Sequence, residues 1–194
     1  MSRRDADATA ADGYRAGVTF DLAAAKRALT DGFPQVADHP DVAGVLRDPA
    51  LLALIGPALV HPYRESGVTV VAAPEARGPI VAALAAVELG AGLVLARKED
   101  RNHPGADLRV ESEPTWRGRP EQFQARSFDL SESDRVLIVD DWITTGNSLR
   151  AVAALVERCG ATVVGGAALV DKADPATVAE LRVHTLVAFD DIGR

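Results

Sequence analysis

Short, uninterrupted apolar segments recur along the chain and alternate with longer ones. The short segments are rich in β-branched residues and lie at 68–73, 92–96, 136–139, 162–170 and 184–189. An apolar run without polar alternation is typical of a strand buried on both faces of a parallel sheet. The longer segments predict helices at 20–29, 49–60, 79–90 and 148–159. Strands that alternate with helices predict an α/β fold in a single domain, with a central, mainly parallel sheet flanked by helices.

Two segments do not follow this alternation. Residues 97–133 are polar and rich in Pro and Gly, which predicts an insert between the second and third strands. Residues 1–16 are polar and lack the apolar stretch of a secretory signal. We expect them to form a disordered tail in front of a domain at 17–194.

Composition and charge narrow the classes of function. The chain has 194 residues, 47% of them hydrophobic, and a formal net charge of −7. This charge disfavours a nucleic-acid-binding surface and gives no attraction to an anionic membrane. Its single cysteine, Cys159, excludes an internal disulfide and fits a reducing cytosol. We therefore expect a cytoplasmic protein whose partners are small molecules, not nucleic acid or a membrane.

Charged and hydroxyl-bearing residues follow the third predicted strand, where a parallel sheet binds its ligands. Asp140 and Asp141 come directly after the strand, residues 144–148 form a loop, and a helix then begins. A loop that leads into a helix presents unpaired N–H groups and the positive end of the helix dipole, which bind anions. Carboxylates suit sugar hydroxyls or a metal ion instead. The stretch therefore predicts a ligand with a phosphate beside a diol.

The segment "VLIVDDWITTGNS" resembles the phosphoribosyl pyrophosphate (PRPP) signature of type I phosphoribosyltransferases. The resemblance implies that Asp140 and Asp141 are catalytic residues that hold the ribose hydroxyls and help to place Mg²⁺ through water. Asn147 replaces a usual glycine and Ser148 a usual threonine, and both keep hydrogen-bond donors. The implied 5′-phosphate site consists of Thr144, Thr145, Gly146, Asn147 and Ser148.

Two further segments resemble the pyrophosphate-binding parts of the same family, and each follows a predicted strand. "APEARG" resembles a loop of adenine phosphoribosyltransferases, and "ARKEDRNHPG" has the family's Arg-Lys pair and a later Pro-Gly. The resemblance implies that these segments bind pyrophosphate together with Mg²⁺, and that the protein is a homodimer. The implied pyrophosphate ligands are Ala76, Arg77, Gly78, Arg97, Lys98 and Arg101.

The base-binding part differs most from the family pattern. Trp142 stands where a small aliphatic residue is usual; it belongs either to the core or, with Ile143, to a base pocket. The insert at about 99–130 resembles the family's flexible hairpin and catalytic loop. In adenine enzymes this loop carries Glu-Tyr-Gly, whereas here Trp116 and Arg117 precede Gly118.

The resemblance implies a glycosyltransferase of purine salvage. It would transfer the ribose 5-phosphate of PRPP to a nucleobase, a purine and first of all adenine, and release pyrophosphate. The altered loop leaves two alternatives open. One is a protein that binds PRPP or a nucleotide as a regulator without catalysis, and the other is a transferase with an unusual acceptor.

Overall fold

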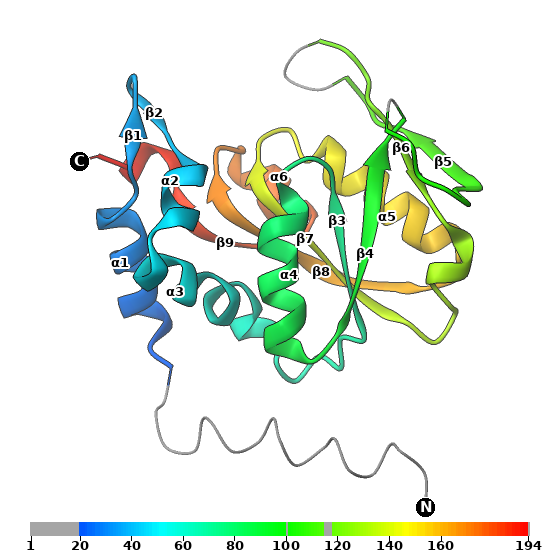
Figure 1. Ribbon diagram of the computed structural model, residues 1–194, viewed down its shortest axis with the longest axis horizontal. Helices are drawn as coiled ribbons and strands as arrows, with labels where there is room; N and C mark the ends of the chain where they lie inside the picture. Colours follow the sequence, from blue (N-terminus) through cyan, green and yellow to red (C-terminus); the bar gives the residue numbers. More distant parts are fainter. Residues whose placement is uncertain (1–19, 100, 115–117, 194) are drawn as a thin grey trace, which may run out of the picture.

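The structure, a computed structural model, describes residues 20–99, 101–114 and 118–193. Its centre is a seven-stranded sheet in the order β5-β6-β4-β3-β7-β8-β9 (Figure 1). β3, β4, β7, β8 and β9 run parallel, which confirms the predicted α/β fold with a mainly parallel sheet. The strands are β3 (Val70–Pro74), β4 (Gly92–Lys98), β5 (Leu108–Glu111), β6 (Gln122–Ala125), β7 (Arg135–Ile143), β8 (Thr162–Asp171) and β9 (Val183–Ala188).

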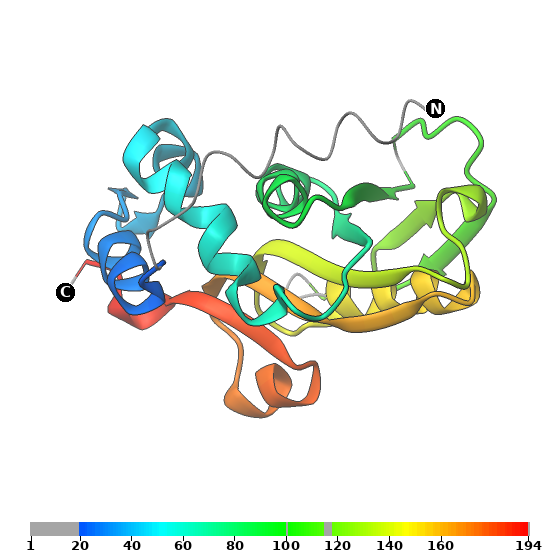
Figure 2. The same ribbon diagram turned by 90° about the horizontal axis from the view of Figure 1, so that it is seen from below.

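Helices cover both faces of the sheet (Figure 2). Because side chains alternate along a strand, neighbouring residues of β3 and β7 point to opposite faces. Val71 and Val139 pack in one core cluster with α3 and α4, whereas Ala72 and Ile138 pack in a second cluster with α5. The helices are α1 (Leu22–Asp31), α2 (Val42–Arg47), α3 (Pro49–Val60), α4 (Gly78–Leu89), α5 (Asn147–Arg158) and α6 (Pro175–Glu180), with 3-10 turns η1 (His61–Tyr63), η2 (Ser127–Asp129) and η3 (Phe189–Asp191).

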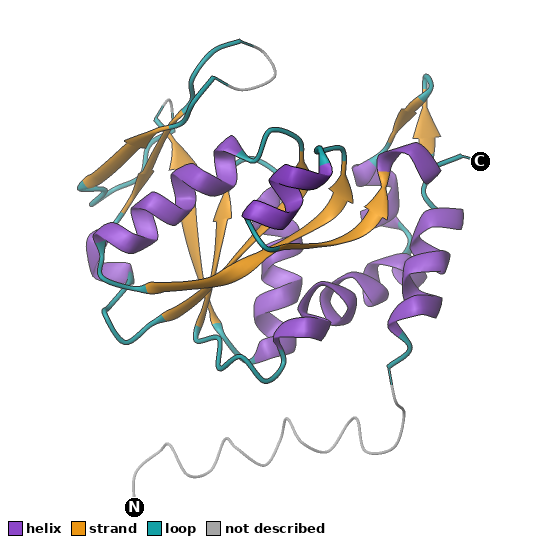
Figure 3. Cartoon of the chain, turned by 180° about the vertical axis from the view of Figure 1, so that it is seen from behind, coloured by secondary structure: helices purple, strands orange, loops and turns teal. Residues whose placement is uncertain are grey.

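A small N-terminal layer lies beyond β9 at one end of the sheet (Figure 3). It contains α1, α2 and a hairpin of β1 (Gln35–Val36) and β2 (His39–Pro40). The Gln35 amide donates to the carbonyl of Ile192 at 3.1 Å, which joins this hairpin to the C-terminal segment. The sequence predicted α1 and α3, whereas α2, α6 and this hairpin were not predicted.

The third predicted strand, β7, is longer than its apolar run. It continues from Val139 to Ile143, so Asp140 and Asp141 lie within the strand and not after it. The reason is its neighbour β8, with which Asp140 pairs opposite Ala168 and Ile143 opposite Asp171. The backbone of both acids is therefore held by a ladder of hydrogen bonds, even though their side chains are charged.

The polar insert adds two strands to the edge of the sheet. β5 and β6 pair antiparallel, and β6 also pairs antiparallel with the end of β4 at Arg97 and Lys98. Residues 1–16, Trp116 and Arg117, which carried predictions, lie outside the described residues. Among the helices of residues 20–99, 101–114 and 118–193, we find none with the length and apolar character needed to cross a membrane.

Candidate active site

Four predicted site residues meet at the carboxyl edge of the two central strands. Arg77 precedes α4, which follows β3, and its Nε donates to Asp141 Oδ2 on β7 at 2.6 Å. Gly78 begins α4 directly against Asp140, because a Cβ added at Gly78 would lie 2.7 Å from Asp140 Oδ1. The structure therefore brings the predicted pyrophosphate loop and the predicted ribose acids into contact. Only glycine leaves room for this approach.

The two acids are buried, and their proximity changes the acidity of one of them. Asp140 is 9% exposed and Asp141 is 7% exposed. Burial raises the pKa of the Asp140 carboxyl well above its usual value, and the neighbouring Asp141 carboxylate adds to this rise. The Asp141 backbone N–H, which donates to Asp140 Oδ1 at 2.8 Å, and the charge of Arg77 oppose the rise in that pKa.

The raised pKa of Asp140 predicts a pH-dependent cost to stability. A carboxyl whose folded-state pKa exceeds its unfolded value of about 3.9 stabilises the fold below that value, and loses this contribution as pH rises through the folded pKa. Asp140→Asn removes the titrating group and keeps its shape. The free energy of unfolding of the variant minus that of the wild type should rise with pH, as measured by urea unfolding of both proteins between pH 4 and pH 8. A pH-independent difference would contradict the prediction.

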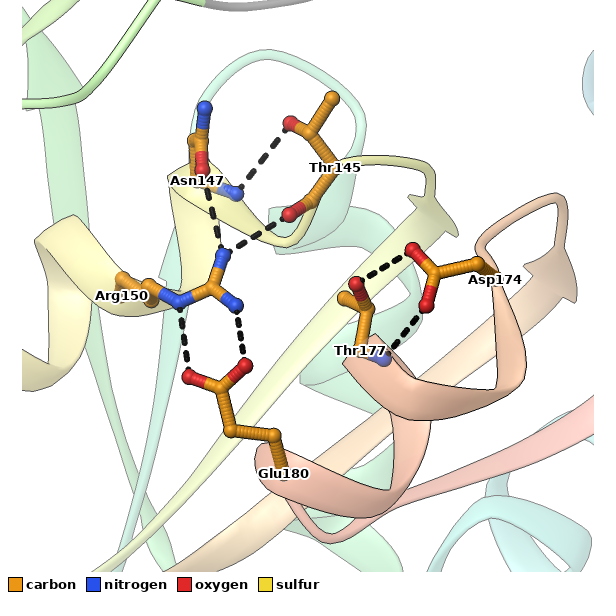
Figure 4. Close-up of polar contacts among 6 residues, drawn as sticks. All are labelled: Thr145, Asn147, Arg150, Asp174, Thr177 and Glu180. Atoms are coloured by element: carbon orange, nitrogen blue, oxygen red, sulfur yellow. Dashed lines mark hydrogen bonds and ion pairs between the residues drawn. The ribbon is translucent and has the colours of Figure 1, made fainter.

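The predicted 5′-phosphate loop leads from β7 into α5. Gly146 has φ of 75° and ψ of 0°, a left-handed conformation that suits glycine, and it is the N-cap of α5. Thr144 and Thr145 lie before it, and Asn147 and Ser148 open the helix. The Asn147 side chain donates to the carbonyl of Pro114 in the insert at 2.8 Å. Figure 4 shows the loop beside Arg150 and α6.

The other predicted pyrophosphate ligands lie near the end of β4. Arg97 Nη2 is 3.2 Å from Glu75 Oε1 in the loop after β3. Lys98 Nζ is 2.5 Å from Glu121 Oε1 in the insert. Ala76 follows a cis peptide bond after Glu75 and is exposed, and Arg101 is exposed in the turn after β4. Arg77, Arg97 and Lys98 therefore each have a carboxylate partner in this structure.

Trp142 forms an aromatic cluster at the same edge of the sheet. Its ring centroid lies 5.6 Å from that of His39 on the N-terminal hairpin and 5.8 Å from that of Phe189 after β9. Lys172, after β8, places its Nζ 4.0 Å from the Phe189 ring centroid. Among the described residues, the buried Trp142 Nε1 has no hydrogen-bond partner.

Ile143 does not join this cluster, although it was assigned to the base pocket together with Trp142. It is 1% exposed and packs in the core cluster of α5, whereas Trp142 packs against the opposite cluster. The structure thus separates two neighbouring residues of one strand. His39, Lys172 and Phe189 were not singled out from the sequence. Lys172 follows a predicted strand and Phe189 is the last residue of another, so both could have been found by their position at the carboxyl edge, but His39 carried no such signal.

Comparison with known proteins assigns the chain to a family. Residues 42–191 match the family model described as phosphoribosyl transferase domain. The chain belongs to this phosphoribosyl transferase family. The resemblance carried by "VLIVDDWITTGNS" is thereby confirmed at the level of the family.

Several relatives of this phosphoribosyl transferase chain are named adenine phosphoribosyltransferase. The chain is 38% identical to the adenine phosphoribosyltransferase of Cupriavidus taiwanensis over 131 residues, which are 68% of this chain and 67% of that protein. It is 31% identical to that of Serratia proteamaculans over 180 residues, 89% of this chain and 88% of the relative. The crystal structure of adenine phosphoribosyltransferase from Rhodothermus marinus superposes with a TM-score of 0.71 at 31% identity, covering 86% of this chain and 99% of that chain.

Proposed function

We propose that the chain transfers the 5-phosphoribosyl group of PRPP to adenine, giving AMP and pyrophosphate in purine salvage. The observation that carries the proposal is the contact of the Arg77–Gly78 loop with the acid pair of β7, next to a loop that opens a helix. Such an edge offers three adjoining subsites for a pyrophosphate, a diol and a phosphate. The names of the relatives supply adenine as the acceptor.

In this proposal, each part of PRPP has its own set of residues. The 5′-phosphate is held by N–H and O–H donors of Thr144, Thr145, Gly146, Asn147 and Ser148 at the start of α5. Asp140 and Asp141 accept hydrogen bonds from the ribose 2′- and 3′-hydroxyls. The pyrophosphate is bound by Ala76, Arg77, Gly78, Arg97, Lys98 and Arg101.

The reaction forms a bond between C1′ and a base nitrogen and breaks the bond between C1′ and pyrophosphate. Positive charge develops on the ribose ring and negative charge on the leaving group. Arg77, Arg97 and Lys98 stabilise the leaving pyrophosphate when they exchange their present carboxylate partners for its oxygens. Release of Asp141 by Arg77 at the same moment frees that carboxylate to accept from the ribose.

The acid pair also fits a Mg²⁺ ion that arrives with PRPP. Mg²⁺ keeps several waters and is commonly bound by one or two carboxylates together with substrate phosphates. Among the described residues, no group of three or more His, Cys, Asp or Glu side chains is placed to hold a metal ion. Asp140 and Asp141 would hold the ion through water. When bound, Mg²⁺ would add positive charge next to the leaving group.

We assign the adenine ring to the cluster around Trp142, with His39 and Phe189 as its aromatic neighbours. Aromatic rings at centroid distances of about 4.5–7 Å favour offset or tilted packing. The planar adenine ring would pack against these side chains in the same way. Ile143 has no part in this pocket, because its side chain is enclosed on the α5 side of the sheet.

The test is pyrophosphate release from PRPP and Mg²⁺ with adenine, hypoxanthine, guanine, xanthine, orotate and uracil in turn. Release with adenine alone supports the proposal. Pyrophosphate release with a different base would identify that base as the acceptor in place of adenine. PRPP that raises the melting temperature without release on any base would favour the binding-only or unusual-acceptor alternatives.

We also propose that the protein is a homodimer, on the evidence of α4. Its outward face carries Ile80 and Val87, which are spaced about two helical turns apart. Ile80 is 47% exposed and Val87 is 84% exposed. A helix that is apolar on every side is typical of a buried position, and a second copy of the chain would cover this face.

Replacement of Val87 by glutamate should weaken the dimer at least ~10-fold, because it places a charge in an apolar contact. Sedimentation equilibrium of the wild type and the variant measures this directly. Val36, which is also exposed but lies on the β1–β2 hairpin, provides the control as Val36→Glu. A monomeric wild type would contradict the proposal.

Two broader proposals concern the whole chain. The transferase domain spans 17–194, as the sequence pattern predicts, and the family match at 42–191 lies within these bounds. The location is the cytoplasm, where a protein with a single cysteine has its expected redox environment.

A further inference from the structure

Arg150 joins the 5′-phosphate loop to the short helix α6 (Figure 4). Its Nη1 donates to the carbonyl of Thr145 at 2.8 Å and to Asn147 Oδ1 at 3.2 Å. The other edge of the guanidinium faces Glu180, with Nη2 2.8 Å from Oε2 and Nε 3.3 Å from Oε1. One side chain therefore contacts both the loop and α6.

The bond to the Thr145 carbonyl fixes the direction of the next N–H group. In a trans peptide the C=O and the following N–H point in opposite directions. Because Arg150 holds the Thr145 carbonyl, the Gly146 N–H points away from Arg150. The carbonyl oxygen, which would repel a phosphate, is kept on the side of α6.

α6 also packs directly on the loop. A Cβ added at Gly146 would lie 2.5 Å from Leu181 Cδ1 and 3.0 Å from Thr177 Cγ2. The start of α6 is held in turn by Asp174, which accepts from the Thr177 N–H at 2.9 Å and from its hydroxyl at 2.7 Å. α6 is thus a fixed support behind the loop.

We propose that Arg150, held by Glu180, is a positioning residue for the 5′-phosphate of PRPP and of the nucleotide product. This inference rests on the proposed function. Arg150 acts through the loop backbone, because four of its five N–H donors are directed at Thr145, Asn147 and Glu180. The Arg150 side chain is 36% exposed and that of Glu180 61%. An ion pair this exposed adds little to stability, so loss of Arg150 should affect phosphate binding more than folding.

The experiment compares two ligands on the full-length protein by calorimetry. Ribose 5-phosphate probes the 5′-phosphate loop, and pyrophosphate with Mg²⁺ probes the opposite end of the site. Arg150→Ala should weaken ribose 5-phosphate binding by ~10-fold or more, the size expected when one N–H of the loop no longer aligns with the phosphate and its charge-assisted hydrogen bond is lost. Pyrophosphate affinity should change less than twofold. Arg158→Ala is the matched control, since Arg158 lies on the same helix and donates only to the carbonyl of Arg109 among its contacts described here.

A second variant separates positioning from charge. Glu180→Gln keeps an acceptor for Arg150 and should weaken ribose 5-phosphate binding less than Arg150→Ala does. Unchanged ribose 5-phosphate affinity in Arg150→Ala, or equal weakening of both ligands, would overturn the inference and leave the proposed function standing. A wild-type protein that binds neither ligand would overturn both.

Discussion

Replacing both Asp140 and Asp141 by asparagine should lower kcat/KM for PRPP by at least ~10²-fold. This corresponds to about 2.7 kcal/mol of lost transition-state stabilisation. Asparagine has nearly the shape of aspartate, so its oxygen can still accept from Arg77 and from the Asp141 N–H. It lacks the negative charge that opposes the positive charge developing on the ribose ring. The loss should therefore appear in the turnover of a protein that still folds.

The chain offers a second pair of adjacent acids as a control. Asp190 and Asp191 lie in the exposed turn η3, and their double replacement by asparagine should change kcat/KM less than about twofold. Melting temperatures of both double variants report folding. Wild-type turnover in the Asp140/Asp141 variant would remove these acids from the catalytic assignment.

Replacing Gly78 by alanine should lower kcat/KM by about 10²-fold. The added methyl group would lie 2.7 Å from Asp140 Oδ1, closer than van der Waals contact allows. The Asp140 carboxylate must then move away from the start of α4, and a displacement on the order of 1 Å in a catalytic site can cost this much rate. Steady-state kinetics with varied PRPP measures the effect.

Gly90 at the other end of α4 is the matched control. It has φ of 65°, and a Cβ there would meet nothing within 4 Å. Gly90→Ala should reduce stability by about 1 kcal/mol through left-handed strain and leave kcat/KM unchanged. Equal kinetics for the two alanine variants would show that the approach of Gly78 to Asp140 has no role in the reaction.

The sequence predicted the parallel part of the fold because its signals are local. Only neighbouring residues were needed to recognise the apolar runs at 68–73 and 136–139 and the helix α3, which starts with Pro49 after its N-cap Asp48. The predicted end of β7, at residue 139, was wrong. Two adjacent acids, Asp140 and Asp141, are typical of the end of a strand when only the local sequence is considered. Their strand conformation depends on pairing with β8, which is distant in the sequence.

The site shows the same division between local and distant signals. Arg77 and the acid pair were singled out from separate strand ends, and the structure brings them within 2.6 Å. The contact of His39 with Trp142 depends on how the N-terminal hairpin folds back over the sheet, and a pattern along the chain does not contain this. The opposite orientations of Trp142 and Ile143 follow from side-chain alternation in a strand, once β7 is known to include them.

The ion pairs Arg77–Asp141, Arg97–Glu75 and Lys98–Glu121 have a consequence for how PRPP arrives. The fields of Arg77, Arg97 and Lys98 are each opposed by that of a neighbouring carboxylate, in a chain whose net charge is −7. Long-range attraction therefore does not speed the diffusional encounter of this anion with the protein. The association rate should vary little with ionic strength, and discrimination begins only after contact, when the basic side chains exchange one anion for another.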